Sequence, residues 1–481
     1  MGPLGNTQLW QGPADASGTH GALGVAWTVR RGAGGSKGMN PATNAAERVI
    51  ELVGDRAEAE AFVQIGRTEL TRFANSFIHQ NVGEDYVNVR VRVASEARVA
   101  AVTGNHADDE ALAALVDDAL TVAATQPVDP DWPGVAPAMD LAPTDFAAPS
   151  TVEATPGQRA EVVSDFVEAG SGYLAAGYCD TDWFDSGFAN SAGHVASSRG
   201  SRATIDGIHQ TGESAGSGHQ TSTAMESLDG VATGSLAGDR ARRGLNAFDL
   251  TPDEYEVVLG PEAVATIAIF LGFYGFNGKA HNEAQSFAEL GAVQFDERIT
   301  LVDDPLGEAA LASPFDVEGT PKLHHVLVDG GVTEMLVHDR RSAKKAGVET
   351  TGHGWSGSAS HGPMATHLVV NPGSDSIDEM IAAVDRGVYV AAFNYCRILD
   401  PKTQVVTGLT RNGTFMIENG AITGAVTNLR FTQSFLNAWG PGNVLAVGDD
   451  LRYADCDFGA GLVRAPSMRL TSWNFTGGAG G

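Results

Sequence analysis

One apolar segment in the second half of the chain constrains the fold more than any other feature. Residues 261–274 contain mainly Ala, Val, Ile and Phe, and they follow a short apolar strand pattern at residues 255–259. Pro261 suits the first position of a helix, where its missing N–H would have no partner in any case. Beyond Val293 the patterns are mainly those of strands and turns. The segment therefore predicts one central helix in a β-rich region.

Two short turn motifs indicate how the strands of this region are connected. Residues 326–332 turn on Asp-Gly-Gly and residues 415–422 turn on Asn-Gly, and both motifs favour tight hairpins between antiparallel strands. Glycine is frequent, with 59 residues in the chain, which favours many turns over a helical bundle. Residues 376–386 predict one more helix. We expect a mostly antiparallel, barrel- or sandwich-like domain around the central helix.

The first half of the chain mixes helix and strand patterns. Residues 58–67 alternate with Ala59, Ala61, Val63 and Ile65 on one side, as in a half-buried strand. A short link at 68–70 is expected before the next strand. The remaining predictions are helices at 44–53, 108–123 and 157–169, strands within 71–82, at 86–94 and at 98–103, a proline-rich linker at 126–155, and a strand-and-turn region at 173–220. These patterns predict an N-terminal domain of α/β type.

The length of 481 residues exceeds what one hydrophobic core usually serves. Residues 1–38 are rich in glycine and carry no pattern that would pack a core, so we expect an extended or disordered start and interpret Met39 as the native first residue. We predict an N-terminal domain over 39–245 and a C-terminal domain over 246–481. The fold class is α+β.

Charge and cysteine content exclude several classes of function. The formal net charge of −28 disfavours nucleic acid and acidic membrane surfaces, whose binding needs lysine and arginine, and would weakly attract basic unfolded peptides. Three cysteines cannot form a disulfide framework, which indicates a reducing cytoplasm. The sequence contains no run of about 18 apolar residues, so it does not predict a membrane span.

Several short motifs, taken in order, resemble the TldD/PmbA family of metallopeptidase-related proteins. None is specific alone, but their order along residues 44–477 is. The longest piece, residues 278–305, resembles the signature that follows the central helix of the second domain. The pieces are residues 72–75, 278–305, 315–319, 327–331, 351–353, 371–373, 417–420, 447–450 and 465–467.

The resemblance implies a zinc site in one branch of the family. There, a His-Glu-x-x-x-His helix and a cysteine near the C-terminus hold the metal, and the carboxylate accepts a proton from bound water. In this chain His281 is aligned with the first ligand, but Asn282 follows it and Ser286 stands five residues on. Glu283 is displaced by one residue and is the candidate catalytic carboxylate. Cys456 lies near the place of the metal-binding cysteine.

Other histidines could complete a site in principle. His353, His361 and His367 lie in a Gly/Ser-rich loop that we expect to be flexible, and residues 324–325 are a histidine pair. Adjacent strand residues point to opposite faces, so the pair would not act together. The broken motif favours the PmbA (TldE-like) branch, whose members lack the paired histidines, and no cofactor is expected in this chain itself.

Three functions follow from the resemblance and the broken motif. The first is the zinc-lacking subunit of a cytoplasmic peptidase that acts on unfolded or modified peptides, assembled with a zinc-bearing TldD-like homologue. The second is a divergent active metallopeptidase that binds zinc through His281 and Cys456 and uses Glu283 as base. The third is a peptide-binding homodimer without peptidase activity.

Other hydrolytic and nucleotide-binding chemistries are poorly supported. The Gly-Ser segments at 216–218 and 354–358 lack the strand-to-helix context of a nucleophile elbow. The sequence also lacks the Gly-x-x-x-x-Gly-Lys-Ser/Thr motif that cradles phosphates.

Overall fold

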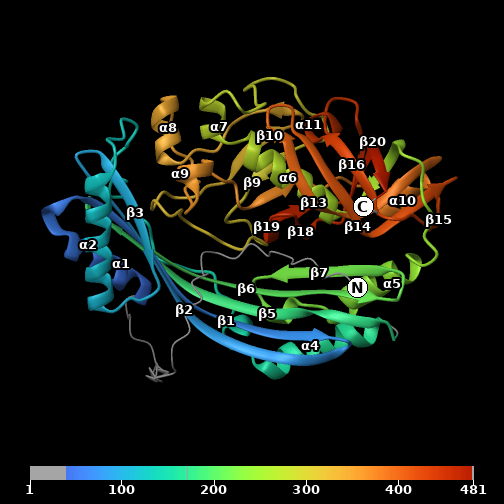
Figure 1. Ribbon diagram of the computed structural model, residues 1–481, viewed down its shortest axis with the longest axis horizontal. Coiled ribbons are helices and arrows are strands. Elements are labelled where there is room, and N and C mark those ends of the chain that lie inside the picture. Colours follow the sequence, from blue (N-terminus) through green and yellow to red (C-terminus); the bar gives the residue numbers. More distant parts are fainter. Residues whose placement is uncertain (1–39, 171, 479–481) are drawn as a thin grey trace. The chain divides into compact units, whose positions relative to one another are not determined.

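The N-terminal half folds around one long, largely antiparallel sheet, in which only the short β4 pairs in parallel (Figure 1). The computed structural model describes residues 40–170 and 172–478, so the expected extended start at 1–38 lies outside the described residues. Seven strands form the sheet in the order β3-β2-β1-β5-β6, with β4 and β7 both paired to β6. These strands are β1 (Glu58–Ala74), β2 (Phe77–Ser95), β3 (Arg98–Gly104), β4 (Thr144–Asp145), β5 (Leu174–Asn190), β6 (Val195–Gln210) and β7 (Ala215–Ser222).

Helices cover one face of this sheet because alternate strand residues there are small and apolar. Ala59, Ala61 and Val63 are fully buried against helix α1, which confirms the predicted alternation. Asn40 and Asp108 cap helices α1 and α2 by accepting hydrogen bonds from backbone N–H groups of their first turns. The helices are α1 (Pro41–Val53), α2 (Asp109–Thr125), α3 (Pro149–Val152), α4 (Pro156–Ala169) and α5 (Gly230–Arg243), with 3-10 turns η1 (Gly54–Arg56) and η2 (Met225–Ser227).

Glycines allow α5 to approach its neighbours very closely. A Cβ atom at Gly234 would lie 2.3 Å from the carbonyl oxygen of Phe166 in α4, and one at Gly216 in β7 would lie 2.2 Å from that of Ala237 in α5. Any side chain at Gly234 or Gly216 would therefore force the neighbouring backbone to move. This packing fixes α5, and therefore the side chains it carries, against the sheet.

The C-terminal half contains a closed barrel and a second sheet. Strands β13, β8, β20, β16 and β14 pair in a ring that closes through β13–β14, while β15 and β17 extend it. A six-stranded sheet has the order β11-β10-β9-β12-β19-β18. The strands are β8 (Asp253–Leu259), β9 (Leu301–Asp303), β10 (His325–Asp329), β11 (Val332–Thr333), β12 (Leu368–Val370), β13 (Arg386–Asp400), β14 (Val405–Glu418), β15 (Ala421–Ala425), β16 (Leu429–Ser434), β17 (Val444–Val447), β18 (Arg452–Cys456), β19 (Gly459–Ala465) and β20 (Met468–Gly478).

Helix α6 (Pro261–Phe270) lies between the barrel and the second sheet, and all its residues are buried (Figure 1). It continues as a π-helical turn over Leu271–Gly275, so the prediction of one central helix is confirmed. The other helices are short and lie at the surface of the C-terminal half. They are α7 (Gly278–Asn282), α8 (Arg340–Ala346), α9 (Ser358–His361), α10 (Ile377–Ala382) and α11 (Phe435–Ala438). No helix of the described residues is long and apolar enough to cross a membrane.

The structure confirms the α+β class and both hairpins but corrects several element boundaries. The expected link at 68–70 is wrong, because β1 continues through it in register with β2 and β5. The helix predicted over 376–386 ends at Ala382, because Arg386 already pairs with Glu418 in the barrel. The region 173–220 forms three long strands, β5 to β7. The predicted limit at 245/246 falls between α5 and β8.

Candidate functional site

The helix that carries His281 is a single short turn. Asn277 caps α7 by accepting hydrogen bonds from two backbone N–H groups, and its amide donates to the carbonyl oxygens of His361 and Pro363. The helix ends at Asn282, and Ala284 has a positive φ of 58°. Glu283 therefore stands beyond the end of this helix.

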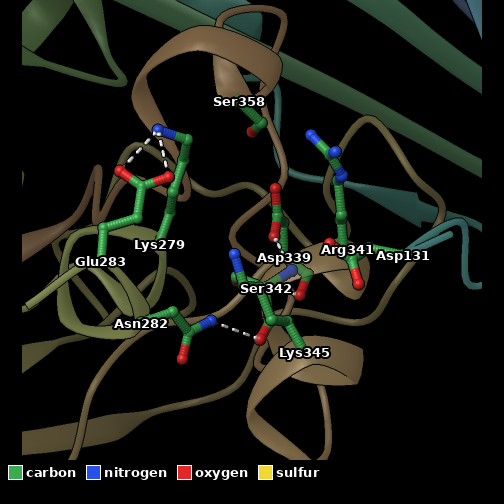
Figure 2. Close-up of a pocket in the computed structure, with 9 residues that line it drawn as sticks. All are labelled: Asp131, Lys279, Asn282, Glu283, Asp339, Arg341, Ser342, Lys345 and Ser358. Carbon is green, nitrogen blue, oxygen red and sulfur yellow. Dashed lines mark hydrogen bonds and ion pairs between the residues drawn. The ribbon is translucent and has the colours of Figure 1, made fainter. Parts of the chain in front are cut away.

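Glu283 lines a small polar pocket at the surface (Figure 2). Its carboxylate accepts a hydrogen bond of 3.1 Å from the Lys279 ammonium, and Asn282 donates one of 3.0 Å to the Ser342 carbonyl oxygen in α8. The pocket holds three acidic and three basic side chains in all. Its lining consists of Asp131, Lys279, Asn282, Glu283, Asp339, Arg341, Ser342, Lys345 and Ser358.

Cys456 lies elsewhere, at the end of β18. Its thiol is buried and donates to the carbonyl oxygen of Gly459 at 3.1 Å. Burial raises the pKa of the Cys456 thiol, which disfavours the thiolate that zinc would need. Figure 1 shows α7 and β18 well separated, with α6 between them. In the part of the chain that the structure describes, no three His, Cys, Asp or Glu side chains are grouped as a metal site.

Two of the three loop histidines expected to be flexible, His353 and His367, are instead buried around Asp303. The Nε2 atom of His353 lies 3.0 Å from one carboxylate oxygen of Asp303, and the backbone N–H of His367 donates to the other at 2.8 Å. Lys322 reaches the same cluster and donates to Thr366 at 2.9 Å. Burial opposes ionisation of Asp303, but Lys322 and His353 outweigh it and lower its pKa. The expectation of mobile ligands is therefore wrong for both histidines.

The remaining histidines point in different directions. His361 is exposed and its ring stacks on Trp355. His324 lies 3.4 Å from Asp304, whereas the half-buried ring of His325 packs against His353. The two adjacent histidines thus have different partners, in line with strand geometry.

A second buried charge cluster joins the N-terminal sheet to the C-terminal half. Arg92 of β2 lies 2.7 Å from Glu60 of β1 and 2.8 Å from Glu318, which also accepts the backbone N–H of Arg340. Next to it, Asp316 accepts three backbone N–H bonds, including one of 2.7 Å from Gly354. Burial, and then the nearby Glu318 carboxylate, raise the pKa of Asp316 from 3.8 to about 7.

This raised pKa predicts a pH-dependent stability. The folded state keeps a proton on Asp316 that the unfolded chain releases near pH 4, so this contribution is present at low pH and is lost as the pH rises from about 4 to about 7. Asp316→Asn is expected to flatten the fall in the free energy of unfolding over this window, measured by denaturant titration at several pH values. The exposed Asp118→Asn serves as control. Equal pH slopes in wild type and Asp316→Asn would contradict the assignment.

The sequence reasoning overlooked Glu262, the second residue of α6. One of its carboxylate oxygens lies 3.4 Å from Arg240 of α5, and the other lies 3.1 Å from Arg452 of β18. Arg240 also donates to the Ser217 carbonyl oxygen in β7 at 2.9 Å. Burial opposes ionisation, but Arg240 and Arg452 outweigh it and lower the pKa of Glu262 to about 2. In the sequence, Glu262 could have been noticed as the one charged residue of the mainly apolar segment 261–274.

The motif His-Glu-x-x-x-His can also be set on Glu262, but only its glutamate is then matched. Residues 261–266 read Pro-Glu-Ala-Val-Ala-Thr, so Pro261 and Thr266 stand where His-Glu-x-x-x-His has its two imidazoles. The Pro261 side chain has no donor atom for a metal, and the Thr266 hydroxyl donates to the Glu262 carbonyl oxygen at 3.1 Å. Both oxygens of Glu262 face guanidinium groups. The residues here do not fit a zinc ion, although β18 with Cys456 packs against this helix.

Comparisons with known proteins agree with the fold and the ordered motifs. Residues 252–477 match the family model for the PmbA/TldA metallopeptidase C-terminal domain. A metalloprotease TldD homologue from Buchnera aphidicola is 27% identical over 251 residues, 48% of this chain and 50% of that protein. A metalloprotease from Methanothermobacter thermautotrophicus is 25% identical over 320 residues, 63% of this chain and 69% of that protein. The chain thus spans about half the length of the Buchnera relative.

Solved structures share the fold over most of the chain. The crystal structure of TldE from Thermococcus kodakarensis has a TM-score of 0.79 at 19% identity and covers 90% of this chain and 100% of that one. A structure from Bacteroides thetaiotaomicron, whose description suggests a modulator of DNA gyrase, has a TM-score of 0.76 at 19% identity, with 90% and 98% covered. Together with the match of the C-terminal domain and the sequence relatives, these findings identify the chain as a member of the TldD/PmbA family of metallopeptidase-related proteins.

Proposed function

We propose that this chain is a zinc-lacking, non-catalytic subunit of a TldD/PmbA-type peptidase, assembled with a zinc-bearing TldD-like homologue. The observation that carries the proposal is the start of α6. With the carboxylate of the motif set on Glu262, Pro261 and Thr266 take the places of its two imidazoles, and Arg240 and Arg452 engage that carboxylate. A carboxylate held between two guanidinium groups has a lowered pKa and does not readily accept a proton.

The contacts of Glu283 and Cys456 further support a non-catalytic role over a divergent metallopeptidase. Glu283 is paired with Lys279, and the Cys456 thiol is buried and donates to a carbonyl oxygen. For the divergent enzyme to work, His281 and Cys456 would have to meet around one ion together with a third ligand, with Glu283 free to act as base. A carboxylate that is already paired and a protonated thiol do not offer that set.

In such an assembly the chain would bind and position an unfolded or modified peptide. A cavity of about 150 Å³ lies between the face of the N-terminal sheet opposite the helices and a loop of the C-terminal half. Phe184 offers an apolar wall there, and Asp182 and Arg202 offer charges of both signs, which suits a peptide with mixed side chains. The three described cysteines are free and buried, which is compatible with a cytoplasmic location.

Zinc content and peptidase activity, measured on the chain alone and after co-expression with a His-Glu-x-x-x-His homologue, test the proposal. We expect well under one zinc per chain and no peptide cleavage for the chain alone, and about one zinc per heterodimer with cleavage after co-expression. His281→Ala and Cys456→Ala in this chain should leave the metal content of the complex unchanged. Zinc near one per chain in the isolated protein, lost on His281→Ala, would establish the divergent enzyme instead.

A further inference from the structure

Two charged side chains lie side by side in the cavity between the N-terminal sheet and the loop at residues 311–312. Asp182 of β5 and Arg202 of β6 are directly opposite each other in the antiparallel register, and both line the cavity. The Cβ atoms of such a pair are about 4.5–5.5 Å apart, so both groups can reach one small ligand. The cavity of about 150 Å³ has room for a single peptide side chain, since a water molecule takes about 30 Å³.

The Asp182 carboxylate is fixed through one of its two oxygens. Its Oδ1 atom accepts hydrogen bonds of 2.9 Å from the Thr68 hydroxyl and 3.3 Å from the Tyr86 hydroxyl. Gly66 makes room for the second bond, because a Cβ atom there would lie 2.7 Å from the Tyr86 oxygen. Burial, and then the Asp182 carboxylate, raise the pKa of Tyr86, so its hydroxyl remains a donor at neutral pH. The Oδ2 atom accepts no hydrogen bond from the described residues, so it is free to accept one from a ligand.

Arg202 supplies donors next to this free oxygen. Its Nη2 atom lies 3.4 Å from a carboxylate oxygen of Asp180. Its Nε atom is buried and has no acceptor in the part of the chain that the structure describes. A buried donor without a partner is unfavourable, so a ligand that brings an acceptor into the cavity is favoured.

The remaining walls of the cavity are apolar and held in place. Gly200 lets the Phe184 ring lie against β6, because a Cβ atom there would lie 2.8 Å from the ring. On the opposite wall, the backbone of Leu311 is fixed at both polar groups. Its N–H donates to the Tyr453 hydroxyl at 2.7 Å, and its carbonyl oxygen accepts a hydrogen bond of 2.9 Å from His367. Such walls suit a short methylene stem that ends in a polar group.

We propose that this cavity binds a primary carboxamide, the side chain of glutamine or asparagine in a peptide. The inference rests on the proposed function, because it takes the ligand to be part of a peptide. One edge of a primary carboxamide carries both an N–H donor and a carbonyl acceptor. The N–H donates to Oδ2 of Asp182, and the carbonyl oxygen accepts from Arg202. A trans backbone amide does not match this pair, because its N–H and C=O point in opposite directions.

Other side chains of similar length fit the two charged groups less well. A carboxylate would be repelled by Asp182, and an ammonium group would be repelled by Arg202. An apolar side chain would leave the free oxygen of one group and the free N–H of the other without partners. A site built from hydrogen-bonding groups rejects a ligand that leaves them unpaired.

Isothermal titration calorimetry of the full-length chain with a matched peptide series tests the proposal. The peptides are acetyl-Ala-Ala-X-Ala-Ala-N-methylamide with glutamine, glutamate, lysine or methionine as X, so that only X can carry a primary carboxamide. We expect the glutamine peptide to bind at least about tenfold more tightly than each of the other three. Equal affinities across the series would overturn the proposal.

Asp182→Asn is expected to reverse the specificity. The new side chain keeps an oxygen for the hydroxyls of Thr68 and Tyr86 and presents an NH₂ donor in place of Oδ2. A carboxylate then meets donors on both sides, so this variant should bind the glutamate peptide about tenfold more tightly than the glutamine peptide. The exposed Asp118→Asn in α2 is the matched control and should keep the order of the wild type.

An unchanged preference for glutamine in Asp182→Asn would place the ligand elsewhere and overturn the assignment. Circular dichroism verifies that the variant is folded, and the peptide series on the wild type decides the question even if it is not.

Free L-glutamine distinguishes the source of the carboxamide. Its two charged end groups lose water on approaching the cavity, so it should bind at least about tenfold more weakly than the peptide. Equal binding of the free amino acid would overturn the assignment to a peptide. The proposed function fails separately: a co-expressed complex without zinc or cleavage would refute it, whereas the calorimetric preference of the isolated chain would be unaffected.

Discussion

Replacing Glu262 by alanine is expected to lower the free energy of unfolding by about 3–5 kcal/mol, because it leaves the buried Arg240 without its counter-charge. Glu262 is 6% exposed and lies between Arg240 and Arg452. The Arg240 side chain is itself 5% exposed, so water cannot replace the lost carboxylate. Denaturant titration monitored by circular dichroism measures the change.

Two companion variants separate the charge from the packing. Glu262→Ala combined with Arg240→Met removes the stranded cation and should recover much of the loss, since an apolar replacement of a buried pair is often nearly neutral. Glu51→Ala removes an exposed partner of Arg48 and should cost less than about 1 kcal/mol. A loss below about 1 kcal/mol for Glu262→Ala would show that this ion pair does not hold α5, α6 and β18 together.

The elements that the sequence predicts well are those specified by local contacts. The apolar run after Pro261 forms the buried helix, and the Asp-Gly-Gly and Asn-Gly turns form the hairpins, because the residues that set these structures are adjacent in the chain. The predictions of a link at 68–70 and of a helix reaching Arg386 are wrong for the opposite reason. There, pairing with strands far away in the chain overrides the local pattern.

The candidate site was harder to predict because its contacts are distant in sequence. The second partner of Glu262, Arg452, is 190 residues away, and no local pattern links them. The glycine-rich surroundings of His353 suggested mobility, yet Asp303, 50 residues earlier, holds its ring in the interior. The histidine pattern of the sequence points to His281, whereas Glu262 at the start of α6 has no histidine close to it in the sequence.

The second large effect is expected at Arg92, where the N-terminal sheet meets the C-terminal half. Arg92→Met removes the cation shared by Glu60 and Glu318, whose side chains are 1% and 3% exposed. Arg90 still approaches Glu60 at 3.5 Å, but no such cation remains for Glu318 among the ion pairs of the described residues. We expect the free energy of unfolding to fall by about 3–5 kcal/mol, because a buried carboxylate is left uncompensated.

The same substitution should change how cooperatively the chain unfolds. Glu318 belongs to the C-terminal half and Arg92 to β2, so their 2.8 Å contact couples two parts whose main hydrophobic clusters are separate. Only a small cluster of Phe188, Ala196 and Phe315 is shared between them. Fluorescence and circular dichroism transitions that coincide in wild type should separate in Arg92→Met, as when two units no longer unfold together. Arg92→Lys keeps the positive charge but loses the planar guanidinium group. Its free energy of unfolding should therefore lie between those of wild type and Arg92→Met. The exposed Arg48→Met is the matched control, and an equally small effect of both methionine variants would refute the coupling.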